Sequence, residues 1–396
     1  MKPGRAVRSR RSGRARAWAE LLRLPALFTV PGDVLAGAAA TSAHANSRTL
    51  LAIGSSLCLY EAGMALNDWA DRTEDAVERP HRPIPSGRIR PAEALTAACV
   101  LTAAGLTLAA RAGRPALAVA APLATTVWAY DLALKHTPAG PAAMATARGL
   151  DLLLGAAATT GHTREAVPSA ALLGTHTLAV TTVSRQETRD GSPLPPLAAL
   201  AATALLTRLI TPRLPADRGR ATTLGLPGTT ASGAIDADLI PRTTSTLTDT
   251  ALAAGRRLLG AAADVAVPRG GGGALRGMRA APARRVPARV VQAALHVPPA
   301  TAPGTATPAT ALSTFGTTAL RTALSAAYAA TVVRPYFHAA LNPSPPLTQR
   351  AVGSGIRATI PLQAALAARS GARTGALLVA ALAPLGRKFA RKVSVT

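Results

Sequence analysis

Aromatic side chains are scarce in this sequence, and their scarcity argues against a large water-soluble core. Phe, Trp and Tyr make up 3% of the 396 residues, whereas apolar residues make up 48% and charged residues only 16%. The mean hydropathy is +0.23, which is not typical of a soluble enzyme. Ala, Leu, Gly and Thr are abundant instead, and small residues suit the packing of helices inside a bilayer. The composition therefore predicts a membrane protein with several spans.

Cysteine is also rare. The two cysteines, Cys58 and Cys99, lie in or beside apolar runs and show no metal-ligand spacing. We expect both to be buried as small hydrophobic residues.

Acidic residues are outnumbered, with 19 Asp and Glu against 44 Lys and Arg, which gives a net charge of +25. Arginines cluster in "RAVRSRRSGRARAW" before the first apolar run, so residues 1–17 are predicted to form a basic cytoplasmic N-terminus under the positive-inside rule. Nucleic-acid binding is the rival explanation of this charge. It is disfavoured because the basic residues flank apolar runs and aromatic residues are few.

The first forty residues have the outline of a signal peptide, with a basic start followed by "LLRLPALFTVPGDVLAGAAATSA". Arg23, Asp33 and two prolines inside this run, together with many later apolar runs, favour a functional first span instead.

Apolar stretches close to the length of a bilayer span recur along the chain. They predict an all-α, multi-span transmembrane helical bundle of about nine helices, seven in residues 18–211 and two in residues 315–396, which end in a basic tail. The expected spans are 18–42, 49–70, 92–111, 114–131, 142–160, 168–187, 193–211, 317–333 and 356–386.

Residues 212–314 depart from this pattern. They are rich in Pro, Gly, Thr and Arg and have no sustained periodicity, so we expect a low-complexity, disordered insert. The alternation of spans puts the insert on the non-cytoplasmic side. A reading-frame error in a GC-rich gene is an alternative origin for it.

If the N-terminus is cytoplasmic, the second, fourth and sixth spans end on the cytoplasmic side. The polar segments 67–88, 130–135 and 184–190 lie at these three ends. This coincidence predicts one cytoplasmic site.

The segment "NDWADRTEDAVERPHRPIPSGRI" begins at Asn67 and follows the second apolar run. On a helix, Asn67, Asp71 and Asp75 are spaced four apart and share one face, joined by Glu74 and Glu78. Mg²⁺ would relieve the repulsion among these carboxylates, because it is held by one or two carboxylates together with substrate phosphates. A solvated acidic helix end, with salt bridges to the following arginines, is the alternative.

The same segment resembles the first signature of the UbiA superfamily of intramembrane prenyltransferases, N-x-x-x-D-x-x-x-D followed by R-P-[IL]-x-S-G. The likeness extends to "LLRLPALFTVPGDVLAG", "YDLALKHTPAGPAAMATARGLDLLLGA" and "GIRATIPLQAALAARSG". In detail the chain is most similar to the bacterial EboC-like branch. The resemblance implies nine transmembrane helices around a central cavity that opens to the cytoplasm and laterally to lipid.

By this resemblance Asn67, Asp71 and Asp75 would bind Mg²⁺ and the diphosphate of an isoprenyl donor. Metal ions and fixed cations stabilise the charge that develops on the leaving diphosphate. Arg79 and Arg82 are placed to supply bidentate phosphate contacts. Arg88 is a weaker candidate, because a basic residue just before a span can simply mark the membrane boundary.

The family's second signature, D-x-x-x-D at the end of the sixth helix, is replaced here by "SRQETRDG". Glu187 and Asp190 are three apart and can face one site, although Asp190 adjoins Gly191 and a loop. We expect Glu187 to be the acidic ligand, with Asp190 secondary and Arg185 on the phosphate. An ordinary charged loop is the alternative, and binding of a second Mg²⁺ stays open.

In the family, a Tyr and a basic residue after the fourth span approach the donor phosphates, which implies roles for Lys135 and Tyr130. Snorkelling of the lysine and an interfacial tyrosine are the alternatives. Asp33 and Glu61 lie inside predicted spans, where ionisable groups are costly, and either could orient the acceptor or pair with Arg23 or Arg148. His81 and His136 are expected at the surface, with proton transfer as the alternative.

These inferences predict an integral membrane prenyltransferase that uses Mg²⁺ to transfer an isoprenyl group from an isoprenyl diphosphate to an electron-rich small-molecule acceptor. An aromatic or quinone-precursor acceptor is one option. The expected location is the cell membrane, with the active-site loops cytoplasmic and the bilayer, rather than nucleic acid, as partner. The alternative is a non-catalytic membrane protein or transporter that binds polyprenyl phosphates or lipids.

Overall fold

The computed structural model describes residues 13–186, 191–212 and 308–393, and it describes no side chains at 24–26, 308–315 and 387–393. The chain separates into two compact units. One combines Met1–Pro212 with Ala306–Thr396, and the other is Arg213–Thr305. The second unit, and with it nearly all of the predicted insert, lies outside the described residues.

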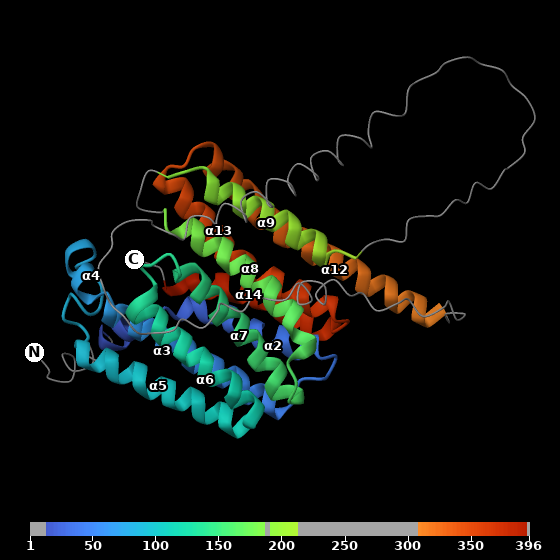
Figure 1. Ribbon diagram of the computed structural model, residues 1–396, viewed down its shortest axis with the longest axis horizontal. Helices are drawn as coiled ribbons and strands as arrows, with labels where there is room; N and C mark the ends of the chain where they lie inside the picture. Colours follow the sequence, from blue (N-terminus) through green and yellow to red (C-terminus); the bar gives the residue numbers. More distant parts are fainter. Residues whose placement is uncertain (1–12, 187–190, 213–307, 394–396) are drawn as a thin grey trace, which may run out of the picture. The chain divides into compact units, whose positions relative to one another are not determined.

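Every regular element in the described part of the chain is a helix, which confirms the predicted all-α class. Figure 1 shows helices α3, α5, α6 and α7 side by side. The elements are η1 (Leu24–Thr29), α2 (Val30–Ala40), α3 (Ser47–Ala70), α4 (Arg72–Glu78), α5 (Pro91–Ala112), α6 (Arg114–Ala129), η2 (Tyr130–Leu134), α7 (Gly140–Thr160), η3 (Arg164–Ala166), α8 (Val167–Ser184), α9 (Leu194–Ile210), α12 (Pro308–Leu341), α13 (Pro345–Arg369) and α14 (Arg373–Val393).

Four helical stretches in these residues are long and apolar enough to cross a membrane: Ser47–Ala70, Pro91–Ala112, Arg114–Leu134 and Arg164–Ser184. Shorter apolar helices accompany them at Leu27–Ala40, Leu194–Ile210 and Arg373–Gly386. Since a span needs about 20 apolar residues, the four longer stretches match the second, third, fourth and sixth expected spans.

Two expected spans are each interrupted by a turn. The stretch 356–386 is two helices, because α13 ends at Arg369 and Gly371, at a φ of 81°, turns the chain into α14. The stretch 18–42 is interrupted at Arg23, which has a left-handed φ of 47° just before η1. The eighth span, predicted at 317–333, lies within α12, which has 34 residues. Both turns fall at short polar sequences inside longer apolar stretches, Arg23 and "RSGAR" at 369–373, so hydropathy averaged over the length of a span does not reveal them.

Local sequence explains how α3 begins and what it packs against. Asn46 caps the helix by accepting from the backbone N–H of Thr49, and the Thr49 hydroxyl accepts from the backbone N–H of Asn46. Along its length α3 packs on α5, where the Ser55 hydroxyl donates to the Gly105 carbonyl at 2.8 Å. This close pairing fixes the helix that carries the acidic segment.

The prediction that both cysteines are buried is wrong for Cys99 on α5, which is exposed, while Cys58 on α3 is half-buried. An apolar helix in a membrane bundle has an outward face, and periodicity in a uniformly apolar run does not distinguish that face from the inner one.

Helices α2 and α7 approach each other through glycines. A Cβ on Gly37 would collide with the Leu152 carbonyl, and a Cβ on Gly155 would collide with the Val34 backbone. Small residues at such a crossing let two backbones pack closely inside a membrane. The contact anchors α7, which lines the site described below.

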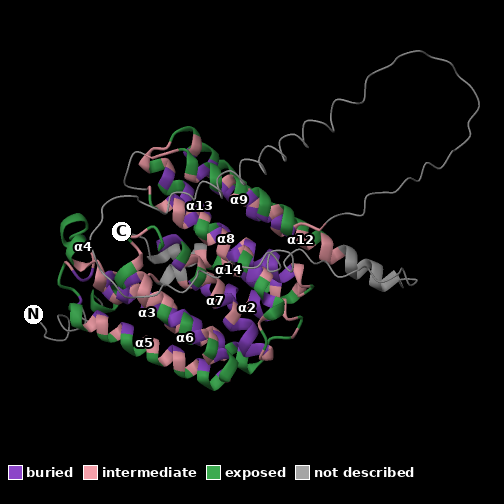
Figure 2. Ribbon diagram, in the orientation of Figure 1, coloured by how far each residue is buried: buried purple, intermediate pink, exposed green. Residues whose placement is uncertain are grey.

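A second group of helices, α8, α9, α12 and α13, shares an apolar core that includes Tyr328 and Tyr336. Buried His176 on α8 joins this core. One ring nitrogen lies 3.2 Å from the Tyr328 hydroxyl and the other 3.1 Å from the Gly355 carbonyl. Figure 2 shows buried residues along the facing sides of these helices.

Candidate active site

The acidic segment keeps its helical hydrogen bonding across the junction between α3 and α4. Helix α3 ends at Ala70, and Asp71, with φ −85° and ψ 3°, joins it to α4. Backbone bonds four residues apart continue through the junction, from Asp71 N to Asn67 O at 2.9 Å and from Asp75 N to Asp71 O at 2.8 Å. Asn67, Asp71 and Asp75 therefore follow one another along one side, as the spacing predicts.

Asp75 is buried, with 1% of its side chain exposed, and is bound by two arginines. Its Oδ2 lies 2.6 Å from Arg82 Nη1, and its Oδ1 lies 3.4 Å from Arg79 Nη1. Asp71 forms an ion pair with Lys135 and lies 3.9 Å from His136 Nε2. The acidic helix face thus meets cations from its own loop and from the segment after α6.

Asp68 belongs to the same network, although the sequence assigned it no role. Its Oδ1 accepts from Arg23 Nη2 at 3.2 Å and lies 3.5 Å from Arg82 Nη1. Arg23 comes from the turn before η1, so this contact bridges two distant segments. Two features of the sequence could have indicated this contact. Asp68 is a carboxylate next to the motif, and Arg23 is a charged residue inside an apolar run.

The end of α6 carries a π-helical turn, η2, closed by a bond from Lys135 N to Tyr130 O at 2.9 Å. Turns of this kind are rare and often occur at functional sites. Asp131, in this turn, is buried and accepts from Asn67 Nδ2 at 3.2 Å. The sequence grouped Asp131 with Tyr130 and Lys135 but did not predict this bond.

These residues surround a polar cavity of about 990 Å³, a volume that includes its open mouth. Its lining carries five arginine or lysine side chains, one histidine and one carboxylate. The lining residues are Arg23, Asn67, Asp71, Arg79, Arg82, Tyr130, Lys135, His136, Gly140, Pro141, Thr181, Ser184 and Arg185.

Seven of the predicted substrate-binding and catalytic residues, Arg185 among them, therefore meet at one cavity. The Arg185 guanidinium donates to the Thr137 carbonyl at 2.5 Å, which fixes its position. Glu187 and Asp190 lie outside the described residues. Asp75 is close by but does not line the cavity, because Arg82 and Arg79 lie between.

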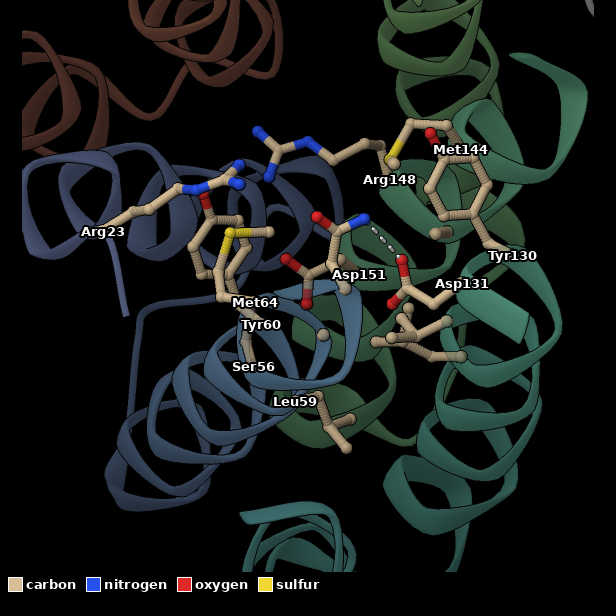
Figure 3. A pocket seen from close by; sticks show the side chains of 15 residues that line it. Arg23, Ser56, Leu59, Tyr60, Met64, Tyr130, Asp131, Met144, Arg148 and Asp151 are labelled. Carbon is tan, nitrogen blue, oxygen red and sulfur yellow. Dashed lines mark hydrogen bonds between the residues drawn. The ribbon is translucent and has the colours of Figure 1, made fainter. Parts of the chain in front are cut away.

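An apolar cavity of about 850 Å³ adjoins the polar one, and Figure 3 shows the side chains that line it. The two cavities share Arg23, Asn67 and Tyr130 as lining residues. Leu59, Leu123 and other apolar residues from α3, α6 and α7 supply most of the remaining surface. A charged cavity and an apolar cavity thus have three wall residues in common.

Arg88 lines neither cavity. Its guanidinium binds Glu20 at 2.6 and 3.1 Å and donates to the His81 carbonyl at 2.5 Å. The hydrogen bond to Glu20 raises the pKa of Arg88 above its ordinary value, so the side chain stays charged. These contacts tie the loop after α4 to the N-terminal helical segment and give Arg88 a structural role.

Two intramembrane carboxylates have different surroundings. Asp33 Oδ2 lies 2.8 Å from Arg148 Nη1, one of the pairings left open by the sequence. Glu61 is buried, and neither of its carboxylate oxygens has a hydrogen-bond partner among the described residues.

The residues at the mouth of the polar cavity fit a divalent cation. Ligand atoms of Asp71, Glu74 and His136 all lie within 4.8 Å of one another. Oxygen donors from one or two carboxylates, with phosphate oxygens completing the shell, match the preference of Mg²⁺. Glu74 is therefore a further candidate ligand, since it lies one position before Asp75 and is exposed rather than bound by arginine.

Comparison with known proteins shows that the part of the chain that carries this site is similar to known prenyltransferases. The UbiA prenyltransferase family matches residues 26–208. A digeranylgeranylglyceryl phosphate synthase of Ignicoccus hospitalis is 36% identical over 149 residues, which cover 37% of this chain and 49% of that protein. The enzyme of the same name from Methanothrix thermoacetophila is 34% identical over 168 residues, covering 42% of this chain and 60% of that protein.

A chloroplastic chlorophyll synthase of Arabidopsis thaliana is 46% identical over 52 residues, which cover 13% of each chain. The chain thus spans about half the length of the curated relatives it matches. Members of this family generally use a divalent metal. The family match and the apolar helices together make the chain a multi-pass membrane protein, and assignment to the EboC-like branch stays a prediction. Through residues 26–208 the chain belongs to the UbiA superfamily.

Proposed function

We propose that the chain is an integral membrane prenyltransferase, which moves an isoprenyl group from an isoprenyl diphosphate to a small-molecule acceptor. The observation that carries this proposal is that a polar cavity and an apolar cavity adjoin and share Arg23, Asn67 and Tyr130 as lining residues. A polar head in one cavity and an apolar chain in the other is the division that an isoprenyl diphosphate requires.

The polar cavity has the charge to hold a diphosphate. Five basic side chains, Arg23, Arg79, Arg82, Lys135 and Arg185, line it beside the single carboxylate of Asp71. Arginine forks bind phosphate oxygens in pairs, whereas lysine acts as a compact point charge. As the allylic C–O bond breaks, fixed cations stabilise the growing charge on the leaving group without having to reorganise.

Mg²⁺ is the proposed cofactor, held by Asp71 with Asn67, Asp75, Glu74 and Glu187 as the further candidate ligands. The ion would supply additional charge stabilisation for the leaving diphosphate. Asp75 contributes chiefly by fixing Arg82 and Arg79, whose Nη1 atoms lie 2.6 and 3.4 Å from its carboxylate oxygens. The Lys135 ammonium, paired with Asp71, faces the same cavity and would bind the donor.

The site is proposed to face the cytoplasm in the cell membrane. Arg14 pairs with Glu93 at 2.9 Å, and Leu21 packs in one cluster with Ile84 and Ile89. Residues 14–21, which include Arg14 and Arg16, therefore lie at the same end of the bundle as the loop after α4. Under the positive-inside rule, a basic segment marks the cytoplasmic side.

The alternative of a non-catalytic protein or transporter is not favoured, because the matched relatives are named as synthases. In addition, Asn67, Asp71 and Lys135 are all present at the cavity.

The test uses purified protein in lipid nanodiscs with radiolabelled geranylgeranyl diphosphate. We expect Mg²⁺-dependent release of diphosphate and, with phenolic, quinonoid or alcohol acceptors present, a labelled lipid product. Chelation by EDTA should stop both, and added Mg²⁺ should restore them. Binding of the labelled donor without any bond cleavage under all of these conditions would contradict the proposal and support the non-catalytic alternative.

A further inference from the structure

The depth of the apolar cavity follows from two helices that line it. On α3, Asn67 lines both cavities, and Ser56 lines the apolar one. On α7, Gly140 lines the polar cavity, and Asp151 lines the apolar one. Each pair is 11 residues apart. Since a helix rises about 1.5 Å per residue, both helices give a depth of about 16 Å from the diphosphate end.

Polar side chains joined to one another close the inner end of this cavity, which consists of Ser56, Arg148 and Asp151 (Figure 3). Asp151 is hydrogen-bonded to Ser56 and to Asp33 on α2. Arg148 Nη1 lies 2.8 Å from Asp33 Oδ2, and Gln363 on α13 donates to Asp33 Oδ1 at 2.5 Å. These bonds join α2, α3, α7 and α13, so the inner end is held in place from four helices.

Beyond the inner end the two helices pack against each other. Ala52 on α3 and Leu154 on α7 are fully buried in one apolar cluster. Further along the same helices, the hydroxyls of Thr49 and Thr159 lie 2.8 Å apart, so α3 and α7 are in contact there. The space that lies beyond the inner end is therefore filled by the protein itself.

This depth corresponds to a small number of isoprene units. Three bonds of an extended chain span about 3.8 Å, so the four chain bonds of one isoprene unit span about 5 Å. Three units therefore reach from Asn67 to the inner end, and the reacting unit lies before them, beside the diphosphate. A fifth unit would have to separate the joined polar side chains, and burying such groups without partners is costly.

We propose that Ser56, Arg148 and Asp151 limit the length of the donor, and that the donor carries at most about four isoprene units. This inference rests on the proposed function, which places the diphosphate in the polar cavity and the isoprenyl chain in the apolar one. The three residues determine specificity at a distance from the reacting atoms. They exclude longer chains and take no part in breaking the bond to diphosphate.

The test gives the protein a choice among donors of different length. Farnesyl, geranylgeranyl and geranylfarnesyl diphosphates, with three, four and five isoprene units, are supplied together at equal concentration in nanodiscs with Mg²⁺ and the phenolic, quinonoid and alcohol acceptors. Their relative rates of consumption give the ratios of kcat/KM. The wild type should prefer the four-unit donor to the five-unit donor by about tenfold or more, because the fifth unit does not fit. The three-unit donor should remain a substrate.

Two variants make room at or near the inner end. Asp151→Ala removes the carboxyl group that closes it and leaves the ion pair of Arg148 with Asp33 intact. Leu123→Ala shortens the lining residue of α6 that lies farthest from Tyr130. Each variant should reduce the preference for the four-unit donor over the five-unit donor by about threefold or more. Monodisperse elution from a sizing column reports folding, and Leu123→Ala decides the question if Asp151→Ala does not fold.

Leu154→Ala provides the matched control. It removes the same atoms as Leu123→Ala and from the same apolar cluster, but Leu154 lies beyond the inner end and does not line the cavity. The substitution should lower the Tm, because it leaves a buried void. Its preference among the three donors should equal that of the wild type.

Three outcomes would overturn the length limit while diphosphate release stays intact. The first is equal use of the four-unit and five-unit donors by the wild type, which would mean that the chain leaves the bundle sideways into lipid. The others are an unchanged preference in folded Asp151→Ala and Leu123→Ala, and an equal shift in Leu154→Ala. Absence of diphosphate release from every donor would instead overturn the proposed function, and the length limit with it.

Discussion

Asp71 and Asp75 sit four residues apart but occupy different electrostatic positions. Asp71 is 19% exposed at the cavity, facing Lys135, whereas Asp75 is 1% exposed behind two arginines. Asp71 can therefore reach a cation beside the donor directly, while Asp75 fixes the guanidinium groups that bind phosphate. The two carboxylates are expected to matter for different reasons.

Replacing either carboxylate by alanine should abolish turnover. Asp71→Ala removes the cavity carboxylate, and Asp75→Ala releases Arg79 and Arg82 from their buried anchor. We expect losses of about 100-fold or more in diphosphate release, similar to the loss of one fixed electrostatic group in other enzymes. Labelled donor and saturating Mg²⁺ provide the assay. Glu78→Ala, which changes an exposed carboxylate on α4, is the matched control. Near-normal activity of Asp71→Ala would contradict the prediction and would mean that the acidic face is only a solvated helix end.

At the end of the sixth span, Glu187 is predicted to be the acidic ligand that replaces the family's second motif. Ser184 and Arg185, which precede it, line the polar cavity. Glu187→Gln should therefore weaken donor binding far more than Asp190→Asn. Equilibrium binding of labelled donor in nanodiscs measures both, and the reverse ranking would move the assignment to Asp190.

At this scale the sequence predicted which residues gather but not how they pair. Helical spacing and the motif placed Asn67, Asp71 and Lys135 at one cavity. The bonds of Asp68 to Arg23 and of Asn67 to Asp131 join segments 45 and 64 residues apart. Such pairings depend on how helices rotate against each other, which the period of one helix does not determine.

Among the helices, the crossing of α2 and α7 depends on the absence of a side chain at one position. A Cβ at Gly155 would overlap the Val34 backbone, whereas a Cβ at Gly149, on the same helix, would meet only the Ala170 carbonyl at an ordinary 3.5 Å. The position, rather than the residue type, decides the cost of a methyl group.

Gly155→Ala should therefore lower the Tm of the detergent-solubilised protein, because the two backbones must separate, at a cost of about 1–3 kcal/mol. Gly149→Ala should leave the Tm unchanged or raise it slightly, since alanine favours a helix over glycine. Thermal unfolding followed by circular dichroism compares the two. An equal Tm for both variants would mean that the crossing adapts without strain.

The boundaries of the helices were harder to predict than their existence. Polar or capping residues separate α3 from its neighbours, so its start was found within two residues. Between α13 and α14, "ARSGAR" offers only a glycine in an otherwise helix-compatible run. Its left-handed φ is a backbone feature that hydropathy does not report.

At the scale of the whole molecule, α9 and α12 are the described helices that precede and follow residues 213–305 in the chain. These helices pack together, and the Arg321 guanidinium donates to the Ile210 carbonyl. Arg321 thus marks the point on α12 that lies next to the end of α9. Phe315 precedes Arg321 by six residues, or about 9 Å of helix. A linker of four or five flexible residues can bridge the distance from the end of α9 to Phe315.

Joining Thr211 to Phe315 through a short Gly/Ser linker should thus preserve membrane insertion and diphosphate release, because the described residues that line the two cavities all lie outside the removed stretch. Membrane abundance and donor turnover are the two measurements. A variant that inserts at normal levels but has lost activity would show that the removed segment shapes the site, and the assignment of its side of the membrane would have to change.

The π-helical turn at Tyr130–Leu134 makes the site sensitive to chain length as well as to side-chain identity. One residue fewer in this turn would restore a regular helix and rotate everything beyond it by about 100°. Lys135 would then leave Asp71, although no charged group had been removed. Deleting Leu132, which is 53% exposed, should abolish diphosphate release, while Leu132→Ala should be tolerated. A population of natural variants would accordingly show substitutions in this turn but no single-codon gaps.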